Sequence, residues 1–188
     1  MQNFEDLFTR IPTISTPRLL MRAARMSDAA DLYEYSKDPD VARHVLWDAH
    51  RSIHQTRGYI RYLLKQYRTG QPSSFVIELQ PERKVIGTIG FMWVQQENRA
   101  AEIGYSLSRA YWNQGIMTEA LRAMIAYGFE KLNLNRIEAQ FESDNPASGC
   151  VMQHAGMRRE GLLRQRIFNK GRFADVELYA ILRHDPRP

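Results

Sequence analysis

The sequence predicts an α+β fold in which a mixed, mostly antiparallel and twisted sheet of about seven strands packs against about four helices. Short alternating or β-branched runs, typical of strands, are interspersed with longer runs in which apolar residues recur every three or four positions. Turn residues separate these runs, and the 188-residue chain shows no repeat and no low-complexity linker. A single domain over residues 1–188 is therefore expected.

The first half of the chain is predicted to fold as a strand, two helices and a hairpin. Ser27-Asp28 can cap the first helix, and Asp38-Pro39 ends it. The second helix has one apolar stripe and closes at Thr69-Gly70 with turn chemistry. A polar turn at 81–84 joins two β-branched runs into the hairpin. The elements in order are a strand at 18–22, helices at 29–37 and 53–69, and strands at 75–79 and 85–94.

The second half adds a strand, a helix, a strand, a helix and a final hairpin. The first of these helices repeats apolar residues in helical phase, so one of its faces packs on the sheet. Asn145 followed by Pro146 opens the next helix, and Gly156 ends it. The elements in order are a strand at 101–107, a helix at 116–131, a strand at 136–141, a helix between Pro146 and Gly156, and strands at 166–168 and 173–182.

The composition indicates a general attraction of the protein for anions, and it also indicates a reducing cellular compartment. The 26 Lys and Arg exceed the 21 Asp and Glu, giving a formal charge of +5, but they are scattered, so no nucleic-acid partner is expected. The apolar runs are far shorter than the about 20 residues that cross a bilayer, so no membrane partner is expected either. With Cys150 as the only cysteine and no signal-peptide pattern, the cytoplasm is the expected location.

The junction between the strand at 101–107 and the helix at 116–131 is the most informative segment. It leaves main-chain N–H groups unpaired at the positive end of a helix, where a phosphate or pyrophosphate can satisfy them. Gly115 suits such a turn because a side chain there would hold the phosphates off the backbone. An anionic ligand is therefore expected at this turn.

Several segments, spread over nearly the whole chain, match one known pattern in the same order. They are Thr16 to Arg22, Ala101 to Tyr105, Tyr111 to Ala120, Asn145 to Ser148, Ala155 to Gly161, and Asp175 to Leu182. Through them the chain resembles the GCN5-related N-acetyltransferase (GNAT) superfamily, and most of all its ribosomal-protein N-terminal acetyltransferase (RimJ/RimL-like) branch and its small-molecule-acetylating relatives. The resemblance implies an enzyme that acetylates a primary amine, which is either a protein N-terminus or a small molecule.

The resemblance also implies acetyl-coenzyme A (acetyl-CoA) as the donor, bound in a cleft where the strand at 101–107 splays away from the strand at 136–141. Main-chain amides of the turn would hold the pyrophosphate. The coenzyme residues expected on this basis are Ser106, Leu107, Asn113, Gln114, Gly115, Ile116, Met117, Thr118, Asn145 and Ser148. The family pattern has Arg or Gln three residues before the glycine, where this chain has Trp112. Since backbone amides make most of the contacts to the pyrophosphate, Trp112 affects a detail of the expected coenzyme site more than the resemblance to the family.

Acetyl transfer needs a neutral amine, a stabilised oxyanion and a proton for the departing thiolate. Glu102 is the candidate base, acting directly or through water, because strand alternation puts it on one face with Gly104 and Ser106. The alternative is an ordinary polar strand residue. A main-chain N–H near Leu107 would meet the oxyanion, since a splayed strand leaves donors without a neighbour.

The proton donor for the thiolate is left open by the sequence. Many relatives carry a tyrosine where this chain has Met152, so Ser148, Tyr105 or solvent would take its place. Cys150 suggests a covalent route, but no histidine is placed to activate it and a helical cysteine is more often a packed residue. Direct transfer in a ternary complex is therefore preferred.

Acceptor specificity is expected from the first two helices and their connection at 45–50, together with the C-terminal hairpin around 168–173. The candidate acceptor contacts are Trp47, Glu102 and Phe168, with core packing as the alternative for Trp47. His50 and His54 lack a third ligand, so no metal is expected. The chain is expected to act as a monomer or homodimer. The competing function is a non-catalytic module that binds coenzyme A or another anion and acts as a sensor or partner protein.

Overall fold

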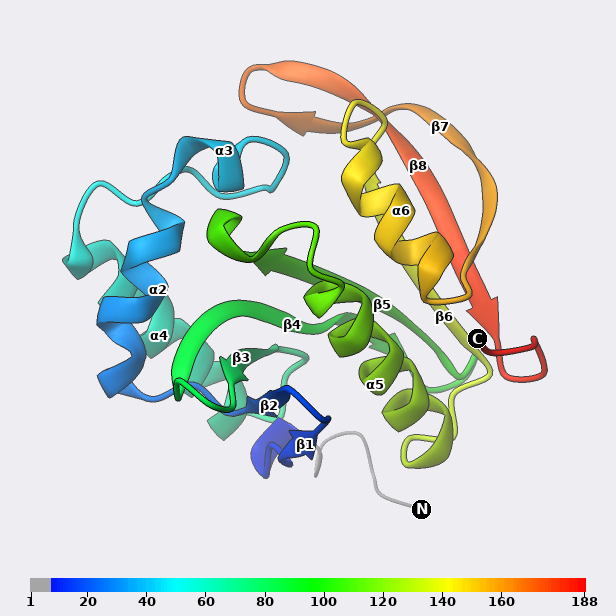
Figure 1. Cartoon of the computed structure of the whole chain (residues 1–188). Coiled ribbons are helices and arrows are strands. Elements are labelled where there is room, and N and C mark those ends of the chain that lie inside the picture. Colours follow the sequence, from blue (N-terminus) through cyan, green and yellow to red (C-terminus); the bar gives the residue numbers. More distant parts are fainter. Residues whose placement is uncertain (1–7) are drawn as a thin grey trace.

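The computed structural model describes residues 8–188, which form one eight-stranded sheet (Figure 1). Its strand order is β1-β2-β3-β4-β5-β6-β8-β7, and every neighbouring pair is antiparallel except β5 and β6. The strands are β1 (Ile14–Ser15), β2 (Leu19–Arg22), β3 (Ser74–Leu79), β4 (Lys84–Gln95), β5 (Ala100–Leu107), β6 (Arg136–Glu142), β7 (Arg158–Asn169) and β8 (Arg172–Leu182). The predicted fold class, a mixed and mostly antiparallel sheet with helices, is confirmed.

Helices cover both faces of this sheet. In β3, Val76 is buried with α2 and α4, whereas its neighbours Phe75 and Ile77 are buried with α5 and α6, so the two helix groups lie on opposite faces. Figure 1 shows the same grouping. The helices are α2 (Ala29–Ser36), α3 (Pro39–Ala42), α4 (Ile53–Arg68), α5 (Ile116–Glu130) and α6 (Pro146–His154), with short 3-10 turns η1 (Met26–Asp28) and η2 (Arg109–Tyr111). None of the described helices is long and apolar enough to span a membrane.

The C-terminal hairpin and the segment after α2 differ from the prediction. β7 begins at Arg158 rather than at 166. The prediction missed its first half because β7 is an exposed edge strand whose ladder with β8 is broken by two register shifts. Gln165, inside the second shift, has a left-handed φ of 48°. Pro39 ends α2, as predicted, but also opens the short helix α3, in which the Asp40 N–H donates to the Asp38 carboxylate at 2.9 Å.

The sheet opens between β5 and β6. These parallel strands pair only at three positions, the last of them being Glu102 opposite Glu138. Beyond it β5 continues alongside β4 to Leu107, and β6 continues alongside β8 to Glu142. The predicted splay of these two strands is therefore present, and main-chain groups on the facing edges are left without a strand partner.

Candidate active site

The connection from β5 to α5 forms a tight turn, the α5 turn (residues 113–118), at the open end of the splayed strands. Asn113 and Gly115 both have left-handed backbones, with φ of 58° and 70°, and Gly115 is the N-cap of α5. Ile116 and Met117 are buried in the main core, which anchors the first helical turn. Its N–H groups have no partners within the helix, and a helix end of this kind has the geometry that suits an anion.

Trp112 holds the α5 turn against the end of β5. Its indole Nε1 donates to the carbonyl of Leu107 at 2.9 Å. The sequence singled out Trp112 only as a departure from the family pattern, and the structure gives it this bracing role. Gln114 adds a second brace, because its side-chain amide donates to the carbonyl of Ala110 at 3.0 Å.

Glu102 lies where the two strands separate, and its carboxylate is fixed from both sides. Trp93 Nε1 donates to Oε2 at 2.7 Å, and Gln140 Nε2 donates to Oε1 at 3.0 Å. Each carboxylate oxygen retains a further lone pair for an acceptor amine or a water. The side chains of Trp93 and Gln140 were not predicted as site residues, since they come from neighbouring strands and no sequence spacing links them to Glu102.

Tyr105 lies on the opposite face of β5 and joins it to the start of α6. Its hydroxyl donates to the carbonyl of Ser148 at 3.1 Å, and Asn145 Nδ2 donates to the Ser148 hydroxyl at 3.0 Å. Burial raises the pKa of Tyr105 well above its usual value, so the phenol stays protonated. Met152, at the position where many relatives have tyrosine, is 1% exposed and packs in the core.

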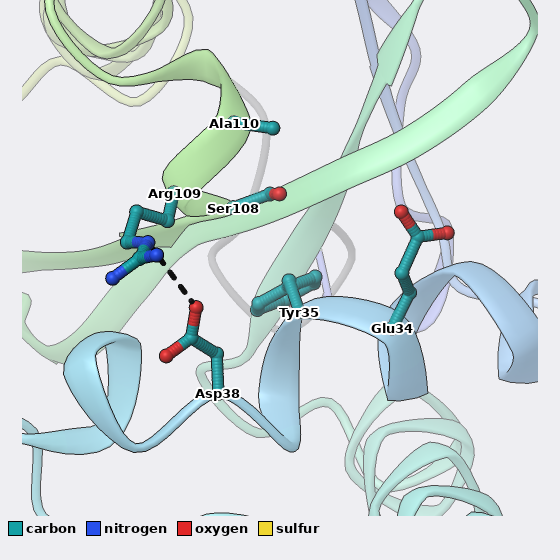
Figure 2. Close-up of a pocket in the computed structure, with 6 residues that line it drawn as sticks. All are labelled: Glu34, Tyr35, Asp38, Ser108, Arg109 and Ala110. Atoms are coloured by element: carbon teal, nitrogen blue, oxygen red, sulfur yellow. Dashed lines mark ion pairs between the residues drawn. The ribbon is translucent and has the colours of Figure 1, made fainter.

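On the face of β5 that carries Glu102, Ser106 belongs to a partly buried cluster of hydroxyl groups. Its hydroxyl lies 3.1 Å from that of Thr88, and both interact with the phenol of Tyr35. Burial raises the pKa of Tyr35 far above its ordinary value. Tyr35 also borders a pocket of about 330 Å³ between α2 and the end of β5, shown in Figure 2. The pocket is lined by Glu34, Tyr35, Asp38, Ser108, Arg109 and Ala110.

Comparison with known proteins places this architecture in one family. The acetyltransferase (GNAT) domain matches residues 18–158. The chain belongs to the GNAT family. The match covers β2 to the start of β7, including the α5 turn and both splayed strands.

Three relatives of this GNAT protein cover between 69% and 92% of its length. It is 38% identical over 173 residues to N-acetyltransferase p20 of Bacillus licheniformis, covering 92% of this chain and 97% of that protein. It is 33% identical over 130 residues to the ribosomal-protein-serine acetyltransferase of Escherichia coli strain K12, covering 69% and 72%. Its structure matches Mycobacterium smegmatis RimJ in complex with CoA-disulfide with a TM-score of 0.82 and 27% identity, covering 91% and 87%. The chain is an acetyl-CoA-dependent N-acetyltransferase, as predicted.

Trp47 and Phe168, two of the three predicted acceptor residues of the GNAT protein, lie on segments that hydrogen bonds connect. Lys170 Nζ, in the hairpin turn, donates to the carbonyls of Val45 at 2.5 Å and Trp47 at 3.2 Å. The Trp47 ring is partly buried, with its centroid 5.7 Å from that of His50, whereas Phe168 is 63% exposed and contacts Phe173. The two rings therefore have different environments: Trp47 is half-buried against the α2–α4 core, and Phe168 is mostly exposed.

Cys150 and His50 lie in different environments, one exposed and one partly buried. Cys150 is exposed on α6, so its expected packing in the core is wrong. His50 precedes α4, and its Nδ1 is within hydrogen-bond distance of the Ser36 and Thr56 hydroxyls, at 2.9 and 2.8 Å. Burial lowers the pKa of His50 below its usual value.

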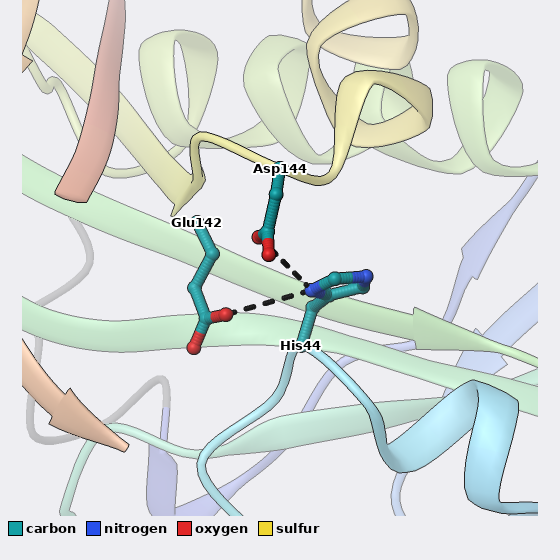
Figure 3. Close-up of side chains that lie close together, drawn as sticks. All are labelled: His44, Glu142 and Asp144. Carbon is teal, nitrogen blue, oxygen red and sulfur yellow. Dashed lines mark hydrogen bonds and ion pairs between the residues drawn. The ribbon is translucent and has the colours of Figure 1, made fainter. Parts of the chain in front are cut away.

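A charged cluster around Glu142, not predicted from the sequence, joins the segment after α3 to the hairpin. Figure 3 shows three of its members, His44, Glu142 and Asp144. The Glu142 side chain is 1% exposed, and Arg172 Nη2 lies 2.6 Å from its Oε2. His44 Nδ1 lies 3.5 Å from the same oxygen and 3.3 Å from Asp144, while Asn169 Nδ2 donates to Oε1 at 2.5 Å. His44, Glu142 and Asp144 have the spacing of metal ligands, but the Arg172 guanidinium already forms an ion pair with each of the two carboxylates.

Removing the charge of Arg172 should destabilise the fold. Arg172→Met leaves the buried Glu142 carboxylate with fewer partners, and we expect a loss of about 1–3 kcal/mol in the free energy of unfolding. Urea denaturation measures this change. Arg166→Met is the control, since Arg166 is exposed in the same hairpin and the described residues give it no ion pair. Equal midpoints for the two variants would rule out a stabilising role for this cluster.

Proposed function

We propose that this protein transfers the acetyl group of acetyl-CoA to a primary amine by direct attack in a ternary complex. The observation that supports this most strongly is the parting of β5 from β6 just beyond Glu102, with the α5 turn at the far end of the opened edge. A thioester lying along that edge has an anion site at one end and a carboxylate at the other.

The coenzyme would follow the open edge of β5. Main-chain N–H groups of the α5 turn would hold its pyrophosphate, where Gly115 leaves the approach unobstructed. Pantetheine would lie against Ser106 and Leu107, with Asn145 and Ser148 across the gap at the start of α6. The donor set consists of main-chain amides and neutral polar side chains, which suits a pyrophosphate that carries an amide-bearing arm.

Glu102 and Tyr105 face opposite sides of β5, so base and acid would act from opposite sides of the thioester. The amine nitrogen attacks the thioester carbonyl carbon, and the oxyanion is met by a main-chain N–H near Leu107. The carbon–sulfur bond then breaks, the amine proton passes to Glu102 directly or through water, and the thiolate takes a proton from Tyr105, Ser148 or solvent.

A protein N-terminus is one acceptor class and a small amine the other. An α-amine, with a pKa of about 7.7–8.0, needs less help from a base than a lysine at about 10.4. The E. coli relative is named for a ribosomal-protein serine, which supports the α-amine. The pocket beside Tyr35, on the Glu102 side of β5, supports a small amine equally.

A thiol-release assay tests this function. Purified protein with acetyl-CoA is offered a panel of peptides with free or blocked N-termini, lysine derivatives and polyamines. We expect turnover that depends on one of these acceptors. The competing function, a non-catalytic coenzyme sensor, is favoured by the buried Met152 at the usual acid position, and it predicts saturable coenzyme binding without any acceptor-dependent thiol release.

The thiolate donor can be identified by removing one hydroxyl at a time. If Tyr105 supplies the proton, Tyr105→Phe should lower kcat by at least about tenfold while Ser148→Ala stays near the parent, because general acid catalysis commonly contributes 10²–10⁴-fold. Steady-state rates at saturating acetyl-CoA measure this difference. The reverse ranking assigns the role to Ser148, and full activity in both variants assigns it to solvent.

A further inference from the structure

Arg18, just before β2, reaches the α5 turn nearly a hundred residues later in the chain. Its Nε lies 2.6 Å from Glu119 Oε2, and its Nη1 donates to the carbonyl of Gln114 at 2.9 Å. The Arg18 main-chain N–H and the Thr16 hydroxyl both donate to Glu119 Oε1, at 3.1 and 2.6 Å. One arginine thus contacts both the turn carbonyl and the only acidic side chain in the first turn of α5.

Glu119 is poorly placed for a protein that binds a pyrophosphate at this helix end. An unpaired carboxylate within a few ångströms of the phosphates would repel them. Burial by itself raises the pKa of Glu119, but the hydrogen bonds from Thr16 and Arg18 outweigh it and hold the pKa below its usual value. The acid is therefore ionised, and Arg18 is the cation that compensates it.

The remaining edge of the guanidinium faces the rim of the turn. Among the described residues, Nη2 has no hydrogen-bond partner, and it lies 3.7 Å from the position that a Cβ would occupy on Gly115. The Arg18 side chain is 45% exposed and borders a pocket of about 490 Å³. That pocket is lined by Thr16, Pro17, Arg18, Gly115, Glu119, Arg122 and Ala123.

We propose that Arg18 is a positioning residue for the coenzyme: it neutralises Glu119, turns the Gln114 carbonyl away from the anion, and presents Nη2 to the phosphate that the α5 turn binds. The inference rests on the proposed coenzyme site. Under this inference, a side chain outside the α5 turn contributes to a phosphate site that is otherwise made of main-chain amides. If Arg18 only connected β2 to α5, its replacement would lower the stability of the fold, but the affinity for coenzyme A would not depend on the charges of Arg18 and Glu119.

The test compares Arg18→Met, Glu119→Gln and the double variant by calorimetry with coenzyme A on the full chain. We expect Arg18→Met to raise Kd by about tenfold or more, since charge-assisted hydrogen bonds contribute about 1.5–3 kcal/mol each. Glu119→Gln should bind at least as tightly as the parent. The double variant should recover part of the lost affinity, because the repelling carboxylate is gone. The slope of log Kd against log salt should fall in both variants without Arg18.

Arg159→Met is the matched control. Arg159 and Glu177 form an ion pair of the same length, 2.6 Å, with a similarly exposed arginine, on the far edge of the sheet. This variant should bind coenzyme A like the parent. Parent-like binding by Arg18→Met would overturn the inference, and equal weakening in the single and double variants would overturn the shielding of Glu119. Absence of binding by the parent would instead refute the proposed coenzyme site itself.

Discussion

Gly115→Ala is expected to raise the Kd for acetyl-CoA by about 10- to 100-fold. The residue has a φ of 70° and open space around it, with only the Arg18 guanidinium near the would-be Cβ. A methyl group therefore fits the free protein, but it projects where the pyrophosphate must approach the backbone. Losing one charge-assisted hydrogen bond of about 1.5–3 kcal/mol accounts for a change of this size. Calorimetry with acetyl-CoA measures it, together with KM in the thiol-release assay.

Gly171→Ala separates this effect from backbone strain. Gly171 lies in the β7–β8 turn, has a φ of 81°, and has nothing within 4 Å of a would-be Cβ. A left-handed alanine costs about 1–2 kcal/mol at either position, so both variants should lose similar stability. Only the Gly115 variant should lose coenzyme affinity. If the two variants bound acetyl-CoA equally well, the pyrophosphate would not lie on the α5 turn.

The sequence predicted well those elements whose burial leaves a periodic pattern. The helix at 116–131 was expected from its apolar stripe, and α5 occupies 116–130 with that stripe buried. The edge strand β7 has no such pattern, because one of its sides has no neighbouring strand and most of its side chains are exposed. Only its last residues, next to a recognisable turn, could be predicted.

The same holds for the candidate site: a segment that is continuous in the chain could be predicted, whereas contacts between distant segments could not. The α5 turn is a continuous segment, so strand, glycine and helix signals together predicted its shape. The partners of Glu102 come from β4 and β6, and the partner of Glu119 precedes β2. Such contacts depend on strand order and register, which no spacing in the chain encodes. The cluster around Glu142 went unpredicted for this reason as well.

Glu102→Gln is expected to lower kcat by about 10²–10⁴-fold near pH 7, the usual contribution of a general base. The substitution is nearly isosteric. The new amide oxygen can accept from Trp93, and Gln140 can rotate its own amide to accept from the new NH₂ group, so both hydrogen bonds at this position are kept. The loss would then reflect proton transfer rather than disturbed packing. Initial rates from pH 6 to 10 with a saturating acceptor measure it.

The pH dependence of this loss also reports the acceptor. A general base raises the rate most while the acceptor amine is protonated. The difference in kcat between Glu102→Gln and the parent should therefore narrow above about pH 8 for an α-amine, and only near pH 10 for a lysine-like amine. Glu138→Gln is the control, because Glu138 lies opposite Glu102 on β6 but pairs with Arg136 at 2.7 Å. It should follow the parent curve. A constant ratio between Glu102→Gln and the parent across the whole range would remove Glu102 from proton transfer and leave it as an ordinary polar residue of the strand.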